Sequence, residues 1–452
     1  MISNGWQSWF ASGGEKRREP NPDASMKMLK EYEKYKNRLM ESGGDLLFQL
    51  TCLDPTDQAL AELFANECLR IEQEGITDPY YLNHPPRNSQ LICDENAIWA
   101  GKIALTRQAF AFPKTEPGST VSTGLPGCGK TTFCILLESQ RVLAGDALVI
   151  VWDIKGTTWR RLLNFPLLAG KVIVLSVNDL KLSLLQPPPG TTSHEWANRF
   201  TNVWAQAYQR FAAQRILREV IDELLSLCPP NCWPTPKMLI DRLKRLQIKA
   251  FREREYVASV CWSLIDMANH FRGLFSYTSS DLFTQLVKQR GKLVIIEDIG
   301  LPTHHWNFLI CLFQEWIFTF RRNNPDQRQF DIIQVLEDAS AVCDPAQDRA
   351  TPGGVSLLAH NLNLSREMRI YVTLISHSIK QISEKIRCNI SNYCCCSLRG
   401  DDLVLAQQVL GITRPQAEFL RANPVGTACI LVPRIWPLPI LINYPNILEL
   451  IQ

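Results

Sequence analysis

The feature that most constrains the fold is a glycine-rich run at residues 124–131, which reads GLPGCGKT. A short β-forming run precedes it at residues 119–123, and an apolar stretch with helical spacing follows at 131–143. The glycines permit positive φ angles, so successive backbone N–H groups can turn toward one anion, and a helix beginning here adds its own unpaired N–H groups. The context predicts a phosphate-binding loop, or P-loop.

The residues of this loop have separate expected roles. Lys130 is expected to reach the outer phosphates of a nucleotide, and the Thr131 hydroxyl to hold magnesium, which predicts ATP and Mg²⁺ as cofactors. Cys128 is interpreted as a small filler, with an oxidation-sensitive thiol at a helix N-terminus as the alternative. The expected nucleotide-binding residues are Gly124, Leu125, Pro126, Gly127, Cys128, Gly129, Lys130, Thr131 and Thr132.

Composition sets limits on the class of protein. The 452 residues are 46% hydrophobic, enough for a sizeable core and two or three domains. The net charge is only +3, so a nucleic-acid surface would have to be a local patch. We find no apolar run of about 18 residues and no apolar signal-peptide core near the N-terminus. These observations predict a cytoplasmic protein without a membrane segment.

Patterning along the chain predicts five segments. Residues 1–25 have the polar, Gly- and Pro-containing composition of a flexible N-terminal lead. Residues 26–90 carry apolar residues at helical spacing and predict a small helical N-terminal region. Residues 91–192 and 289–452 hold strand patterns of one P-loop core, the second part ending in β strands, while residues 193–288 predict an all-helical insertion.

Strand-forming runs alternate with helical stretches through the core. This alternation is typical of an α/β fold with a doubly wound, mostly parallel sheet. A Pro-punctuated β-rich run at 428–442 suits an edge strand or a hairpin. The other predicted strands are residues 119–123, 147–153, 171–176, 292–297, 332–336 and 370–375.

Two strand ends carry adjacent acids that suit nucleotide hydrolysis. Such a reaction requires a carboxylate near the metal and another that orients the attacking water. Glu297 and Asp298 end one apolar strand, and Glu337 and Asp338 end another. The simplest interpretation of either pair is a solvated strand end, so the pattern alone leaves the choice open.

The order of features between about residues 98 and 445 resembles that of HerA/FtsK-type ATPases, which include the coupling ATPases of conjugation systems. The resemblance implies a RecA-like P-loop core. Beside the P-loop, the matching runs are IWAG at 98–101, VIVWDIKG at 149–156, LSLLQPPPG at 182–190, VIIEDIGL at 294–301, YVTLISHS at 371–378 and PVG at 424–426.

The resemblance also implies which acids act. In the family, the strand similar to residues 332–340 carries the catalytic acids, which implies Glu337 and Asp338 as catalytic residues, with Glu337 joining Thr131 at the metal. The family order is Asp then Glu, and this chain has the reverse. A shift of about one methylene in carboxylate reach can slow hydrolysis while leaving binding intact. His377 stands where the family commonly has a Gln that senses the γ-phosphate.

Family members typically form rings, so the resemblance implies a homo-oligomer, most simply a hexamer. An arginine of one subunit then reaches the neighbour's nucleotide, and Arg366, or else Arg369, stands at the matching place before the His377 strand. Lys155 and Asp153 are interpreted as a polar strand end, with a nucleotide-proximal role second. Five basic residues of the insertion face either DNA phosphates or solvent: Lys244, Arg245, Lys249, Arg252 and Arg254.

Two functions remain open from the sequence. The first is a ring-forming ATPase that translocates DNA. The second is a nucleotide-dependent switch or assembly scaffold that recruits a protein partner through its helical N-terminal region, where HerA proteins carry a small β-barrel instead. The reversed acid pair favours this second function. A small-molecule kinase is disfavoured because no acceptor-site motif is visible.

Overall fold

The computed structural model describes residues 29–30, 32–33, 39, 44–53, 58–74, 97–104, 107–271 and 275–451. The chain divides into two compact units, residues 1–86 and residues 87–452, which are described separately. The expected flexible lead at residues 1–25 lies outside the described part. None of the helices in that described part is both long enough and apolar enough to cross a membrane.

The first unit contains helices α3 (Gly44–Leu53) and α4 (Gln58–Glu74). Their contact is a small apolar cluster in which Phe48, Phe64 and Cys68 are buried. The Phe48 and Phe64 rings lie 5.2 Å apart between centroids, within the usual range for aromatic pairs. No strand occurs among the described residues of this unit.

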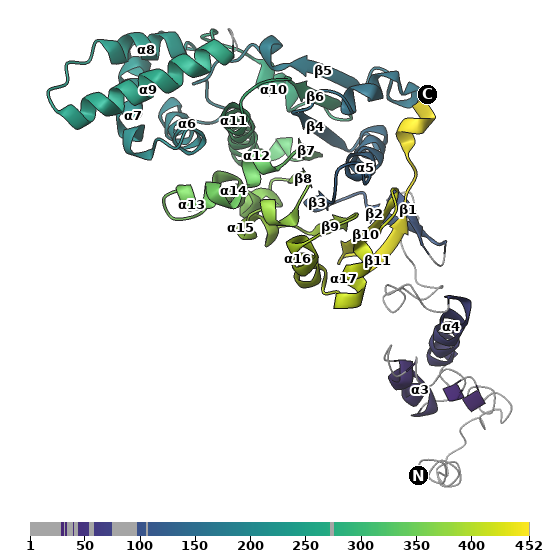
Figure 1. Ribbon diagram of the computed structural model, residues 1–452. Helices are drawn as coiled ribbons and strands as arrows, with labels where there is room; N and C mark the ends of the chain where they lie inside the picture. Colours follow the sequence, from purple (N-terminus) through teal and green to yellow (C-terminus); the bar gives the residue numbers. More distant parts are fainter. Residues whose placement is uncertain are drawn as a thin grey trace, which may run out of the picture. The chain divides into compact units, whose positions relative to one another are not determined.

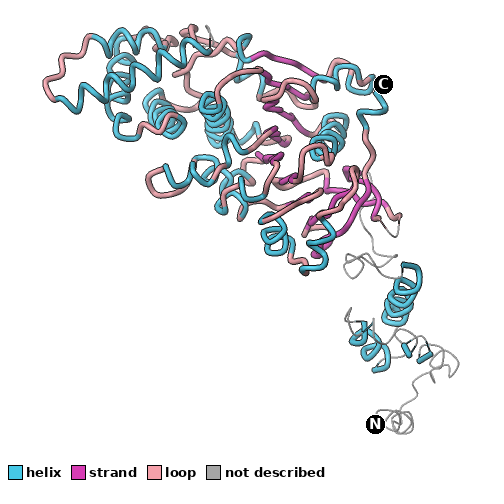
Figure 2. Tube along the Cα trace, viewed as in Figure 1, coloured by secondary structure: helices cyan, strands magenta, loops and turns pink. Residues whose placement is uncertain are grey.

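One mixed sheet organises the second unit (Figures 1 and 2). In the described residues it has eleven strands in the order β2-β1-β11-β10-β9-β3-β8-β7-β4-β6-β5. Neighbours from β9 to β5 run parallel, and those from β2 to β9 run antiparallel. The predicted α/β class with a mostly parallel sheet is confirmed. The strands are β1 (Ala97–Ile103), β2 (Ala109–Pro113), β3 (Thr120–Thr123), β4 (Ala147–Asp153), β5 (Val172–Ser176), β6 (Leu293–Glu297), β7 (Asp331–Glu337), β8 (Ile370–Ser376), β9 (Asn392–Cys395), β10 (Thr427–Val432) and β11 (Trp436–Asn443).

Helices cover both faces of the sheet, which is why its central strands are continuous apolar runs. On one face, α5 (Lys130–Ala144) shares a core with Val149 and Val151 of β4. On the other face, α11 (Thr303–Asn323) packs on Trp152, whose ring centroid lies 4.8 Å from that of Phe313. Every residue of β4, β7 and β8 is buried, as expected for parallel strands between two helical layers.

The C-terminal hairpin lies inside the sheet. Strands β10 and β11 pair antiparallel, which confirms the hairpin predicted at residues 428–442. The edge-strand alternative was wrong, because β1 pairs with β11 through Lys102 and Asn443, and β2 continues outward from β1. The edge of the sheet on this side is therefore formed by β2 and not by the C-terminal hairpin.

Residues 193–288 contain helices and no strand among the described positions. In α7, Leu217, Val220, Ile221 and Leu224 repeat at helical spacing and are buried. The helices of this segment are α6 (Ser193–Ala207), α7 (Gln214–Leu227), α8 (Pro236–Lys244), α9 (Phe251–His270) and α10 (Leu282–Leu286). After β7 follow α12 (Ser340–Cys343), α13 (Pro345–Ala350), α14 (Leu357–Ser365), α15 (Glu384–Arg387), α16 (Asp401–Leu410) and α17 (Arg414–Leu420).

Candidate nucleotide-binding site

The glycine-rich loop joins the buried strand β3 to the first turn of α5. Gly129 is the N-cap, with φ at 101°, and a Cβ there would lie 2.6 Å from the Tyr444 hydroxyl oxygen. Gly127 has φ at 74°, and a Cβ there would meet no other atom within 4 Å. Glycine is favoured at this position by the positive φ and not by a steric clash. The loop therefore presents backbone N–H groups at a helix N-terminus, the arrangement that binds phosphate.

Lys130 is buried and held against this loop. Its Nζ donates to the carbonyl oxygens of Gly124 and Leu125, each at 2.8 Å. The same Nζ lies 3.4 Å from Nδ1 of His377, which follows β8. The P-loop lysine and the residue expected to sense the γ-phosphate are thus neighbours.

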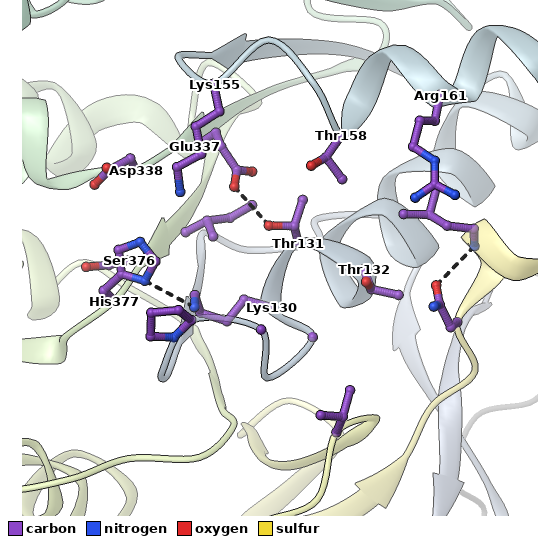
Figure 3. Close-up of a pocket in the computed structure, with 17 residues that line it drawn as sticks. Lys130, Thr131, Thr132, Lys155, Thr158, Arg161, Glu337, Asp338, Ser376 and His377 are labelled. Carbon is purple, nitrogen blue, oxygen red and sulfur yellow. Dashed lines mark hydrogen bonds between the residues drawn. The ribbon is translucent and has the colours of Figure 1, made fainter.

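Glu337, the last residue of β7, reaches the P-loop directly. Thr131 Oγ1 donates to Glu337 Oε1 at 2.9 Å (Figure 3). Trp159 Nε1 donates to the other oxygen, Oε2, at 3.1 Å. Burial raises the pKa of Glu337, while the hydrogen bonds from Trp159 and Thr131 act in the opposite direction. The sequence reasoning missed Trp159, which no motif marks.

Strand order explains why the β7 acids and not the β6 acids meet the loop. Only β8 separates β7 from β3, whereas β8, β7 and β4 separate β6 from β3. Glu297 at the end of β6 instead accepts a hydrogen bond from Arg160 at 2.7 Å. Glu297 and Asp298 are also absent from the lining of the P-loop pocket.

Asp338 takes an unusual conformation immediately after Glu337. Its φ is +60°, a region that residues other than glycine enter infrequently. The Ser340 hydroxyl donates to Asp338 Oδ1 at 2.6 Å, and the carboxylate points away from Thr131 in Figure 3. The two acids of the pair therefore face different partners.

These residues surround a pocket of about 430 Å³. Beyond the expected P-loop side, the lining includes two exposed cations from the segment after β4, Lys155 and Arg161, both drawn in Figure 3. Gly124, Leu125 and Cys128 are not on the lining. The complete lining is Pro126, Gly127, Gly129, Lys130, Thr131, Thr132, Lys155, Thr158, Arg161, Glu337, Asp338, Ile375, Ser376, His377, Val425, Asn446 and Leu448.

Asp153 shapes the turn that carries Lys155. It is fully buried, and its Oδ1 accepts from the backbone N–H groups of Lys155 at 3.2 Å and Gly156 at 2.9 Å. Burial raises the pKa of Asp153. The polar strand end expected here is a buried support for the turn, and Lys155 is the residue that reaches the pocket.

The Cys128 thiol is buried beneath the loop. A hydrogen bond with Cys396, together with burial, raises the pKa of Cys128, although the Lys130 charge opposes this. A buried thiol held protonated is a poor nucleophile, which favours the filler interpretation over the oxidation-sensitive one.

The two candidate arginines differ in their contacts. Arg366 is 69% exposed and pairs with the exposed Glu116 at 3.1 Å. Arg369 donates to the buried Asp331 at 2.7 Å and to two backbone carbonyls, so it is part of the fold. Both precede β8, whereas His377 follows it, which puts about 20 Å of strand between them and the pocket of their own chain.

Comparison with known proteins rests on structure alone. No family model and no curated protein matches the sequence. VirB4 of Thermoanaerobacter pseudethanolicus superposes with a TM-score of 0.60 at 13% identity, covering 78% of this chain and 97% of VirB4. The plasmid coupling protein TrwB in complex with ADPNP, a non-hydrolysable ATP analogue, gives 0.56 at 12% identity, covering 79% and 91%. This chain has the VirB4 and TrwB fold.

TrwB in complex with ADP and Mg²⁺ gives a TM-score of 0.53 at 13% identity, covering 77% of this chain and 89% of TrwB. The VirB4 and TrwB fold confirms the RecA-like core that the HerA/FtsK resemblance implied. At these identities the likeness concerns the fold.

Proposed function

We propose that the protein binds ATP with Mg²⁺ in the P-loop pocket, hydrolyses it and acts as a hexameric motor that moves DNA. The observation that carries the nucleotide part is the 2.9 Å hydrogen bond between Thr131 and Glu337 beside the buried Lys130. A hydroxyl and a carboxylate in contact at the start of a P-loop helix are the oxygen ligands that Mg²⁺ prefers.

The pocket also suits the charge of a triphosphate. Lys130, Lys155 and Arg161 line it, against the carboxylates of Glu337 and Asp338. Mg²⁺ would be held by Thr131 and Glu337 and would offset the charge of the β- and γ-phosphates. The three cations would then bind the phosphate oxygens that the metal leaves free.

His377 is suited to donate a hydrogen bond to the γ-phosphate. Lysine has no acceptor, so the contact with Lys130 Nζ makes His377 Nδ1 the acceptor and leaves the proton on Nε2. Burial and the Lys130 and Lys155 charges lower the pKa of His377, which keeps the ring neutral at pH 7. Its role would match that of the glutamine it replaces.

Asp338 is the residue we assign to water activation. Its carboxylate is already bound by Ser340, and it has one methylene less than glutamate. The role therefore falls to Asp338 Oδ2 unless the carboxylate leaves Ser340. This is the step at which turnover would be slow.

The ring and the DNA substrate are supported by exposed basic residues and by the shared fold. Arg366 is exposed, and its ion pair with Glu116 lies at the surface. Such a pair is weak, so Arg366 could leave Glu116 and bind the nucleotide of a neighbouring subunit. TrwB is a plasmid coupling protein, and this chain shares its fold. The five basic residues near α8 and α9 are exposed, as phosphate contacts require: Lys244, Arg245, Lys249, Arg252 and Arg254.

The second candidate is a nucleotide-dependent switch or scaffold, with the helical first unit as the docking site for a protein partner. The reversed acid pair and the bond from Ser340 to Asp338 Oδ1 favour it, because both would hinder water activation. Steady-state ATP turnover with and without double-stranded DNA separates the two. A motor gives turnover that DNA increases and Lys130→Ala abolishes, whereas a switch binds ATP without turnover in either condition.

A further inference from the structure

Three histidines and an aspartate meet on the opposite side of the sheet from α5. His304 and His305 lie in the first turn of α11, and Asp266 and His270 lie in the last turn of α9. Tyr208, which follows α6, contacts the same group. None of these residues lines the P-loop pocket, so the cluster is independent of the nucleotide site.

Both nitrogen-to-carboxylate distances in the cluster fit a metal coordination shell. His304 Nε2 and His305 Nε2 each lie 3.2 Å from Asp266 Oδ2. Ligand atoms at about 2.0–2.1 Å from a tetrahedral Zn²⁺ lie roughly 3.3 Å from one another. One ligand atom from each of Asp266, His304 and His305 falls within 4.8 Å of the other two.

His305 provides the second, independent observation. Its side chain is fully buried, and its Nε2 makes no hydrogen bond although Asp266 Oδ2 is 3.2 Å away. Buried polar atoms are almost always satisfied, so an unsatisfied one calls for a missing water or ion. The orphaned nitrogen points at the carboxylate with which it would share a metal.

The Tyr208 hydroxyl and His305 Nδ1 are 2.8 Å apart. When Nδ1 carries the proton and donates it to the tyrosine oxygen, the lone pair of Nε2 is free to bind a metal. Histidine ligands of metals in proteins usually have such a partner on the second ring nitrogen, which fixes the tautomer and orients the ring. The cluster thus contains both the ligands and the support for one of them.

We propose that His304, His305 and Asp266 bind one divalent transition metal, with Zn²⁺ the best match, and that water completes its shell. Two imidazoles and a carboxylate suit Zn²⁺ and do not suit Mg²⁺, which prefers oxygen ligands. The metal would link the end of α9 to the start of α11. It would therefore fix the helical segment 193–288 to the helix that covers the sheet.

The test is a competition titration of the full-length protein, treated with chelator and desalted, with Zn²⁺ against a chromophoric zinc chelator in excess MgCl2. We expect one tight site in the wild type. Tyr208→Phe removes an outer-shell partner and should lower the zinc affinity by about 10–100-fold. His304→Ala and Asp266→Asn remove ligands and should lower the affinity by at least as much. His304 and Asp266 are 45% and 44% exposed, so their replacement spares the core. His194→Ala is the matched control, since His194 is an exposed histidine paired with Asp222 outside the cluster.

Two further readouts guard against zinc held by the chain's cysteines. Co²⁺ at the proposed site should give weak visible d–d bands without the strong near-ultraviolet bands of thiolate coordination. Zn²⁺ should raise the Tm of the wild type and of His194→Ala but not of Asp266→Asn. Equal zinc affinity in the wild type, His304→Ala and Asp266→Asn would overturn the proposal, as would a cobalt spectrum showing thiolate ligands alone.

Discussion

Thr131 and Glu337 are 206 positions apart in the sequence and are joined by a 2.9 Å hydrogen bond between hydroxyl and carboxylate. Thr131 lies in the first turn of α5 and Glu337 ends β7, and the two meet because β8 alone separates β7 from β3.

Replacing Glu337 with glutamine should weaken metal binding without lowering the stability of the unliganded protein. The folded-state pKa of Glu337 is raised above 4.5, so its effect on stability is most favourable below pH 4.5 and is lost as pH rises through the folded pKa. At pH 7 without ligand, Glu337→Gln should therefore unfold at the same Tm as the wild type or higher. The additional stabilisation from ATP with Mg²⁺ should fall, because a metal ligand is lost.

Differential scanning fluorimetry with and without MgATP measures both effects. Glu297→Gln is the matched control, since it removes an acid at the end of β6 that does not line the pocket. That control should keep the full MgATP shift. A Glu337→Gln protein with an undiminished MgATP shift would rule out this residue as a metal ligand.

Exchanging the two acids should change turnover more than binding. Glu337→Asp with Asp338→Glu restores the order typical of HerA/FtsK-type ATPases and lengthens the residue assigned to water activation. If carboxylate reach limits the reaction, the double variant should hydrolyse ATP about tenfold faster or more, with little change in ATP affinity. A steady-state phosphate-release assay checks this, and a rate at or below that of the wild type would refute the reach argument.

His377 should make ATP turnover sensitive to acid. Its folded pKa lies below 6.5, so the ring is neutral above that pH and gains a proton as pH falls through the folded pKa. The proton on Nδ1 would break the contact with Lys130 and place two cations together. Turnover should be level from pH 8 to 6.5 and then decrease by up to tenfold per pH unit below the pKa.

The matched variant for this prediction is His377→Gln, which keeps a hydrogen-bond donor but does not titrate. Its pH profile should lose the acidic decline, while His377→Ala should be slow at every pH, by about 100-fold if the donor acts in the transition state. A pH profile of His377→Gln identical to that of the wild type would assign the decline to another group.

Arg366 and Arg369 should behave differently although they are three positions apart. Arg366→Ala should lower turnover of the assembled protein by about 1,000-fold or more if it reaches a neighbour's nucleotide, and should leave the Tm unchanged. Arg369→Ala should instead lower the free energy of unfolding by about 2 kcal/mol or more, because Asp331 is left buried without its partner.

Mixing two inactive variants provides the control. In a mixture of Arg366→Ala with Lys130→Ala, an arginine that acts across an interface should restore part of the turnover that neither variant has alone, because Lys130→Ala subunits supply the arginine to intact nucleotide sites. A mixture as inactive as the separate variants would mean that each subunit works with its own arginine.

Local pattern predicted a large part of this fold. The loop at residues 124–131, the helix after it and the buried strands from β3 to β8 follow from glycine chemistry and apolar runs. Strand order does not follow from alternation, which is why the sequence alone left Glu297 and Glu337 as equal candidates. The family resemblance chose Glu337, and the order β3-β8-β7 supplies the physical reason for its contact with Thr131.

Other site residues had no local signal. Trp159 looks like any core aromatic until its indole N–H is seen on Glu337, and Asn446 lies in an unremarkable C-terminal run. Their places depend on how distant segments pack. The sequence around His304 and His305 gave no sign of a cluster either, because Asp266 lies on another helix, 38 positions before His304.

The most direct test of the central claim is an ATP titration by calorimetry, with and without Mg²⁺, of the folded wild type and Lys130→Ala. The account predicts one Mg²⁺-dependent site per chain in the wild type, weakened at least tenfold in Lys130→Ala because the phosphates lose their buried cation. A folded wild type that takes up no ATP at millimolar concentration, with Mg²⁺ present, would contradict it.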